Sequence, residues 1–128
     1  MFGVNDTTRL HDPAQFVDSL KTLLATVHQR VGRVPTLISA VPPLDHFPAL
    51  PWPLRQFLGG HSHQLDDALQ AFIHTDPGLI YVPNSLEIKP AYFAPDFYHP
   101  NAMGYTIWGQ ALVDAALPHL DLTIKQYA

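Results

Sequence analysis

The chain has 128 residues, of which 47% are hydrophobic and 14% charged, a balance that excludes a disordered tail and is typical of one folded domain. The net charge of −4 argues against a nucleic-acid partner, and the lack of cysteine excludes disulfides and thiolate metal sites. No apolar segment is long enough to span a membrane, and no signal-peptide pattern is visible.

The first clear element is a helix over residues 13–31. Asp12 is a favourable N-cap, Pro13 suits the first helical position, and Gly32 is a typical residue at a helix end. Apolar residues at helical spacing predict an inner face made of Phe16, Val17, Leu20, Leu23, Leu24, Val27 and Val31.

Two apolar segments that follow are typical of buried strands. Residues 34–41 form an apolar run without alternation. Such a run is typical of a strand in a parallel sheet that is covered on both faces. Leu79 to Val82 predict a second, shorter strand of the same kind. Between them, residues 54–74 have a helical pattern, with an inner face of Leu58, Leu65, Leu69, Phe72 and Ile73.

A last helix is expected to begin near Asn101 or Ala102 and to run to Leu117, where Pro118 would end it. Strands that alternate with helices of this length predict right-handed β-α-β units. The fold class is therefore α/β with a parallel sheet.

The first four residues, Met1 to Val4, look like the last turn of a strand whose beginning is absent. Two strands and such a stub would leave an apolar sheet edge uncovered. We therefore expect the chain to be the later part of a larger domain, marginally stable or prone to self-association through that edge.

Polar residues that could carry chemistry follow the predicted strands. Asp96 stands three residues before His99, so its carboxylate can hold one imidazole nitrogen and leave the other as a general base. Asn5 follows the first strand stub, and a side-chain amide at such a place is a suitable oxyanion donor. Taken singly, each pattern is also explained by turn or capping chemistry.

Two motifs together resemble a known family. Gly3-Val4-Asn5-Asp6 and Asp96-x-x-His99-Pro100-Asn101 resemble blocks III and V of the SGNH, or GDSL-type, serine esterases and lipases. Residues 47–55 and Gly104-Tyr105 are similar to a bacterial branch of that family, so the resemblance covers essentially the whole chain. It implies a flavodoxin-like three-layer α/β/α domain, of which residues 1–128 would be the C-terminal portion without the N-terminal strands.

The resemblance also implies a function and a role for each site residue. The protein would hydrolyse a small acyl ester without a cofactor or metal. Asn5 would donate to the oxyanion, His99 would be the general base, Asp96 would orient it, and Gly3 would let the backbone pass close to the site. The compartment would be cytoplasmic by default, unless a preceding segment carries an export signal.

The family's nucleophile is not found among these residues. The family places its serine in block I and a second oxyanion donor in block II, and neither block occurs here. None of the four serines, Ser19, Ser39, Ser62 and Ser85, stands in a comparable motif. The resemblance therefore predicts that the chain is truncated and inactive alone.

Two other interpretations remain open. The chain could be a non-catalytic remnant, or one half of a split protein that binds a partner through its sheet edge. It could also be a metal-binding module that uses His61 and His63 with His46 or Asp45, although surface histidines on a helix explain these residues more simply. Three aromatic residues near the Asp–His pair could line an acyl pocket, namely Tyr92, Phe93 and Phe97.

Overall fold

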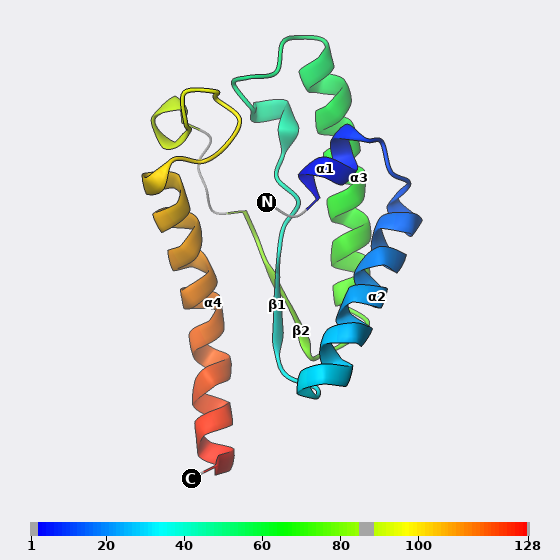
Figure 1. The fold of residues 1–128 in the computed structure, drawn as a ribbon, viewed down its shortest axis with the longest axis vertical. Coiled ribbons are helices and arrows are strands. Elements are labelled where there is room, and N and C mark those ends of the chain that lie inside the picture. Colours follow the sequence, from blue (N-terminus) through cyan, green and yellow to red (C-terminus); the bar gives the residue numbers. More distant parts are fainter. Residues whose placement is uncertain (1–2, 85–88, 128) are drawn as a thin grey trace.

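Helices and strands alternate along the chain in the computed structural model, which describes residues 3–84 and 89–127 and the side chains up to residue 120. The elements are α1 (Val4–Thr8), α2 (Pro13–Val31), β1 (Thr36–Ser39), the 3-10 helix η1 (Leu44–His46), α3 (Leu54–Ile73), β2 (Leu79–Val82), the 3-10 helix η2 (Pro90–Tyr92) and α4 (Ala102–Tyr127). The two strands are parallel, with α2 and α3 on one side of them and α4 on the other (Figure 1). This confirms the predicted α/β fold with a parallel sheet.

The helix α2 has the predicted bounds, and the Asp12 side chain accepts the N–H of Ala14 at 2.8 Å as its N-cap. Its inner face is narrower than predicted. Phe16, Leu20 and Leu24 are buried, whereas Leu23, Val27 and Val31 are 53%, 38% and 62% exposed. The prediction was wrong for these three residues because no described part of the chain covers that side of α2.

The main hydrophobic core lies between α2, α3 and the sheet. The helix α3 ends at Ile73, one residue before its predicted end, and Phe72 of its predicted inner face is only partly buried. The buried residues of this core are Phe16, Leu20, Leu24, Ile38, Val41, Leu65, Leu69, Ile73 and Leu79.

A carboxylate on α3 connects this helix to both strands. Asp66 accepts the N–H of Val41, just after β1, at 2.8 Å and the hydroxyl of Tyr81 in β2 at 2.7 Å. Burial of the ring and the adjacent Asp66 carboxylate raise the pKa of Tyr81, so the hydroxyl keeps its proton and goes on donating. The two contacts fix the carboxyl-terminal ends of the strands against α3.

One edge of the sheet is unpaired among the described residues. The strand β1 is shorter than the predicted 34–41, and the N–H groups of Thr36 and Ala40 donate to carbonyls on the β2 side. Alternate residues of a parallel strand face opposite neighbours, so the backbone groups of Leu37 and Ser39 face away from β2. A cavity of about 280 Å³ lies on this side, and it is lined by Leu20, Leu23, Leu24, Val27, Thr36, Leu37, Ile38 and Ser39.

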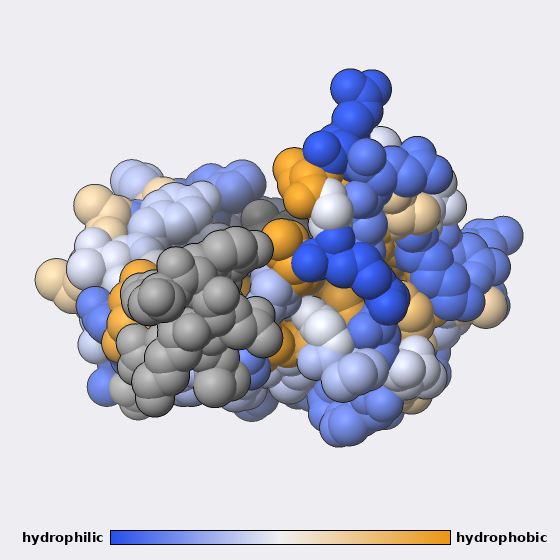
Figure 2. Space-filling model, turned by 90° about the horizontal axis from the view of Figure 1, so that it is seen from below, coloured by the Kyte–Doolittle hydropathy of each residue, from blue (hydrophilic) through white to orange (hydrophobic). Residues whose placement is uncertain are grey.

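Apolar side chains also reach the surface at the lower end of the molecule, where α2 leads into β1. Figure 2, which views the molecule from that end, shows them exposed between polar residues. Val31 and Val34 lie at this turn and are 62% and 44% exposed. Both the edge of β1 and the adjoining turn are therefore uncovered by the residues that the structure describes.

The predicted strand stub at the N-terminus is wrong for the residues that can be assessed. Met1 and Phe2 lie outside the described residues, and Val4 begins α1 instead of ending a strand. The carbonyl of Gly3 accepts both the N–H of Thr7, at 2.9 Å, and its hydroxyl, at 2.8 Å. These two bonds close a helical turn at the place where the apolar pattern alone indicates a strand.

The last helix does not end at Pro118, as predicted, but continues through it to Tyr127. A proline inside a helix removes the hydrogen bond to the residue four positions earlier, here Asp114. Asp114 and Pro118 are both exposed, so water can take the place of the missing N–H. No helix among the described residues is both long enough and apolar enough to cross a membrane.

The helix α3 also holds the loop that follows β1. The buried hydroxyl of Ser62 accepts the N–H of Leu44 at 3.2 Å and donates to the carbonyl of Gly59 at 2.8 Å. Gly59 lies where a Cβ atom would collide with Asp45. A glycine within the helix at this position therefore has a packing reason, since it lets η1 lie directly against α3.

We expect the change Ser62→Ala to lower the free energy of unfolding by about 1–3 kcal/mol, because it leaves the buried N–H of Leu44 without a partner. The exposed Ser19 on α2 is the matched control, and Ser19→Ala should change stability by less than about 0.5 kcal/mol. Urea denaturation measures both variants. Equal stability of the two would show that the Ser62 hydroxyl does not hold η1.

Candidate active site

The centre of the candidate site is the turn between Asp96 and His99. Oδ2 of Asp96 lies 2.7 Å from Nδ1 of His99, and Oδ1 accepts the backbone N–H groups of Tyr98 and His99, each at 3.0 Å. An ionised carboxylate only accepts hydrogen bonds, so Nδ1 donates to it, and in the neutral form of the ring Nε2 keeps its lone pair. Nε2 has no hydrogen-bond partner among the described residues, and it is thus available as a base.

The same contacts keep Asp96 ionised. The His99 side chain, together with the backbone N–H groups of His99 and Tyr98, lowers the pKa of Asp96 to about 2. Both side chains are exposed to solvent, at 51% for Asp96 and 63% for His99. The pair is therefore formed by local hydrogen bonds rather than by burial.

Aromatic packing fixes the turn on its inner side. The ring of Phe47 lies 5.6 Å from that of Phe93 and 5.5 Å from that of Tyr98, and the Tyr98 ring lies 5.3 Å from the His99 imidazole. Phe93 is only 5% exposed. It belongs to the core beneath the turn, so the suggestion that it lines an acyl pocket is wrong.

The residue between Asp96 and Tyr98 has an unusual backbone. Phe97 adopts a left-handed conformation with φ of 54°. A non-glycine residue pays on the order of 1–2 kcal/mol for this conformation. Its N–H donates to the carbonyl of Ala94 at 2.9 Å, and its carbonyl accepts the N–H of Ala49 at 3.3 Å. These bonds join the turn to the loop after η1.

Asn101, directly after the His-Pro pair, holds the loop to the start of α4. Its side-chain amide donates to the carbonyls of Ala91, at 2.8 Å, and Phe93, at 3.1 Å, and its side-chain oxygen accepts the N–H of Gly104 at 3.0 Å. A Cβ atom on Gly104 would collide with the carbonyl of Tyr92. Sequence reasoning gave Asn101 no role, although an asparagine three residues before a helical N–H is a recognisable N-cap.

The predicted oxyanion donor lies on α1. The side chain of Asn5 is exposed and makes no hydrogen bond with another described residue. Its neighbour Val4 is buried in a cluster with Leu44 and Leu58, and Tyr98 packs against that same cluster. The structure therefore brings the segments of Asn5 and His99 to one end of the sheet, at the carboxyl ends of the strands (Figure 1).

Gly3 allows the close approach that this arrangement needs. Its φ of 81° is in the left-handed region, and a Cβ atom there would lie 2.8 Å from Cγ2 of Val41. Glycine is required on both counts. The backbone just before Asn5 can therefore lie directly against the end of β1.

The described serines occupy three different environments in the fold. Ser19 is exposed on α2, Ser39 is half-buried in β1, and the hydroxyl of Ser62 is used inside the core. Ser85 lies outside the described residues. No described serine is hydrogen-bonded to His99.

Of the three histidines considered as metal ligands, His46 and His63 lie beside Asp45, whereas His61 is bonded elsewhere. Nε2 of His61 bonds the carbonyl of His11 at 3.0 Å, whereas Nε2 of His63 lies 3.4 Å from Oδ2 of Asp45, with Nε2 of His46 at 3.5 Å from the same oxygen. In the part of the chain that the structure describes, no three such residues are grouped so that they could hold a metal ion. The structure thus gives the metal-module interpretation no support.

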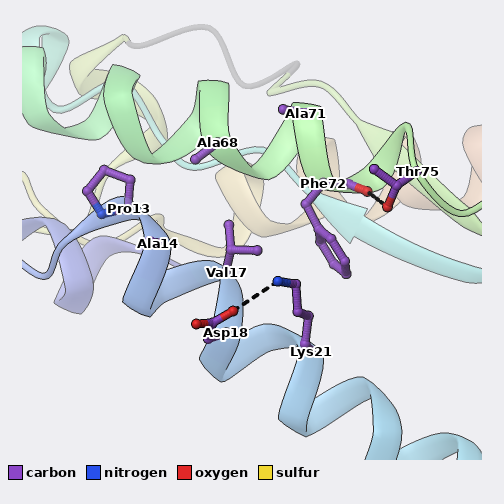
Figure 3. A pocket seen from close by; sticks show the side chains of 9 residues that line it. All are labelled: Pro13, Ala14, Val17, Asp18, Lys21, Ala68, Ala71, Phe72 and Thr75. Carbon is purple, nitrogen blue, oxygen red and sulfur yellow. Dashed lines mark hydrogen bonds and ion pairs between the residues drawn. The ribbon is translucent and has the colours of Figure 1, made fainter.

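A groove elsewhere on the surface is not part of this site. It has a volume of about 560 Å³ and lies between α2 and α3 (Figure 3). Lys21 crosses it, 2.9 Å from Asp18 and with its ammonium group 5.7 Å from the centre of the Phe72 ring. None of the candidate catalytic residues lines it.

Comparison with known proteins agrees with this geometry. The family model for the GDSL-like lipase/acylhydrolase family matches residues 1–107. The chain belongs to that family. The match includes the segments of Asn5, Asp96 and His99, and it implies an esterase-type function for the family as a whole. Searches among curated proteins and among solved structures gave no match.

We expect the Asp96 carboxyl to titrate with a midpoint near pH 2, which NMR of its carboxyl carbon measures. Because its pKa is lowered in the folded state, the stabilisation by this turn is complete above about pH 4 and is lost as the pH falls through about 2. His99→Ala should raise the midpoint, since it removes the largest cause of the shift, whereas His63→Ala should leave it unchanged. A wild-type midpoint near 3.8, the ordinary value, would contradict the bonded geometry.

Proposed function

We propose that this chain supplies the general base, its carboxylate partner and an oxyanion donor to a carboxylic ester hydrolase of the SGNH type that acts on small acyl esters. The observation that carries the proposal is the Asp96–His99 pair, whose Nε2 has no partner among the described residues. The exposed amide of Asn5 belongs to a segment that meets the same end of the sheet. Membership of the GDSL-like family supports the proposal.

In the proposed reaction His99 moves the proton. A serine hydroxyl attacks the ester carbonyl carbon while its proton passes to Nε2 of His99. The imidazolium is stabilised by the Asp96 carboxylate, which stays ionised, and it then gives this proton to the departing alcohol. In the second half a water molecule attacks the acyl-serine while His99 takes its proton, and His99 returns that proton to the serine oxygen as the acid is released.

Asn5 would stabilise the oxyanion that this attack creates. The carbonyl oxygen becomes negatively charged in the tetrahedral intermediate, and a side-chain amide that is not used elsewhere can donate to it. The α1 helix holds the backbone that carries this amide, because Val4 is buried and Thr7 is bonded to Gly3.

The serine nucleophile of this reaction lies outside the 128 residues in our proposal. The described serines have other surroundings, and the family's Gly-Asp-Ser block does not occur in the sequence. Residues 1–128 would then form the C-terminal portion of the catalytic domain. The segment with the serine would supply the missing part of the site.

A second candidate function is binding without catalysis, as a remnant or as one half of a split protein. The unpaired edge of β1 and the apolar cavity beside it favour this candidate, because backbone groups and apolar side chains there lack a partner among the described residues. Self-association through the same edge would satisfy these groups as well.

A recombinant fusion tests the catalytic proposal. It joins a segment with blocks I and II of another family member, including Gly-Asp-Ser, to the N-terminus of this chain, and hydrolysis of p-nitrophenyl acetate is measured. We expect His99→Ala to lower kcat/KM by about a thousandfold or more, and Asn5→Ala by about a hundredfold. His63→Ala, which also changes an exposed histidine beside an aspartate, should have no effect.

Hydrolysis that persists in the His99→Ala fusion would contradict the assignment of the base. A folded fusion that does not hydrolyse the ester at all would favour the second candidate. Hydrolysis that depends on His99 would rule out a purely non-catalytic role.

A further inference from the structure

The turn that carries the Asp–His pair directs two adjacent aromatic side chains to different environments. Tyr98 packs inward against the cluster of Val4, Leu44 and Leu58. Phe97, one residue earlier, is 46% exposed and has no aromatic contact with another described residue. A large apolar ring is therefore presented to solvent next to Asp96.

Neither packing nor backbone geometry explains a phenylalanine at this position. The left-handed φ of 54° disfavours any side chain, and glycine would adopt it without strain. The ring is half in water, so it contributes little to the core. A strained residue beside reactive groups points to a role in the site itself.

Hydrogen bonds hold the backbone that carries this ring in a fixed place. The N–H of Phe97 is bonded to Ala94 and its carbonyl to Ala49, while the next two N–H groups are bonded to the Asp96 carboxylate. The Phe97 backbone is therefore held at a fixed place relative to the Asp–His pair. An apolar side chain on a fixed backbone can bind a flexible chain at a lower entropic cost than one on a mobile loop.

We propose that Phe97 is a specificity-determining residue, whose ring contacts the acyl chain of the bound ester so that affinity rises with chain length. This inference rests on the proposed ester-hydrolase function. Of the three aromatic residues near the pair, Phe93 is buried and Tyr92 is half-buried, with its carbonyl bonded to the N–H of Asn101. Phe97 alone of these three offers a largely free face.

A binding experiment on the chain itself tests this inference without any need for turnover. Methyl acetate, methyl butanoate and methyl hexanoate are titrated in turn, and the His99 ring and the Phe97 amide are followed by NMR. We expect the apparent Kd to fall about tenfold from the acetate to the hexanoate, as partial burial of four methylene groups predicts. The His99 signals should respond to all three esters.

Variants of Phe97 distinguish the effect of its aromatic ring from the effect of its strained backbone. Phe97→Ala and Phe97→Gly should reduce the dependence on chain length to about twofold or less, and the glycine variant also relieves the backbone strain. Phe97→Leu, which keeps an apolar side chain, should retain most of it. Phe57 is 61% exposed on α3, so Phe57→Ala is the matched control and should leave the dependence unchanged.

Two different results would overturn the inference. An unchanged chain-length dependence in Phe97→Ala and Phe97→Gly, with His99 still responding, would remove the role of Phe97 and leave the ester site in place. A folded wild-type chain whose His99 signals respond to none of the esters would contradict the proposed function, and this inference with it.

Discussion

The Asp96 carboxylate accepts three hydrogen bonds within one turn, and the orientation of the His99 imidazole depends on them. One oxygen fixes the imidazole, and the other fixes the two backbone N–H groups that close the turn. Because the bonds lower the pKa of Asp96 to about 2, the carboxylate stays charged over the whole range in which a histidine can exchange protons. Local geometry therefore sets the tautomer and the orientation of the base together.

The rest of the fold keeps this turn at the carboxyl ends of the strands. Asn101 ties it to α4, the Phe47 ring packs beneath it, and the small cluster around Leu44 connects it to α1 and Asn5. On α3, Asp66 bonds the backbone just after β1, and Ser62 bonds the backbone of η1. The positions of the proposed base and the proposed oxyanion donor thus depend on packing contacts between residues far apart in the sequence.

Local signals predicted much of this arrangement. The helix over residues 13–31 was predicted with the correct bounds, from the Asp12 cap and the apolar spacing. The strand Leu79–Val82 was also predicted with the correct bounds, from a short apolar run. Long-range features were harder to predict. The exposure of Leu23 and Val31 depends on what covers α2, the burial of Phe93 depends on Phe47, and the continuation past Pro118 depends on solvent at Asp114. None of these neighbours is visible in a local pattern.

We propose that this chain carries the general base and the oxyanion donor, and that the serine they activate lies outside its 128 residues. The most direct measurement is the intact mass of the purified chain after incubation with a fluorophosphonate, with a complete member of the family as the labelled control. The account predicts no added mass for this chain. The addition of one phosphonyl group, lost in His99→Ala, would contradict it and would identify one of the four serines as a working nucleophile.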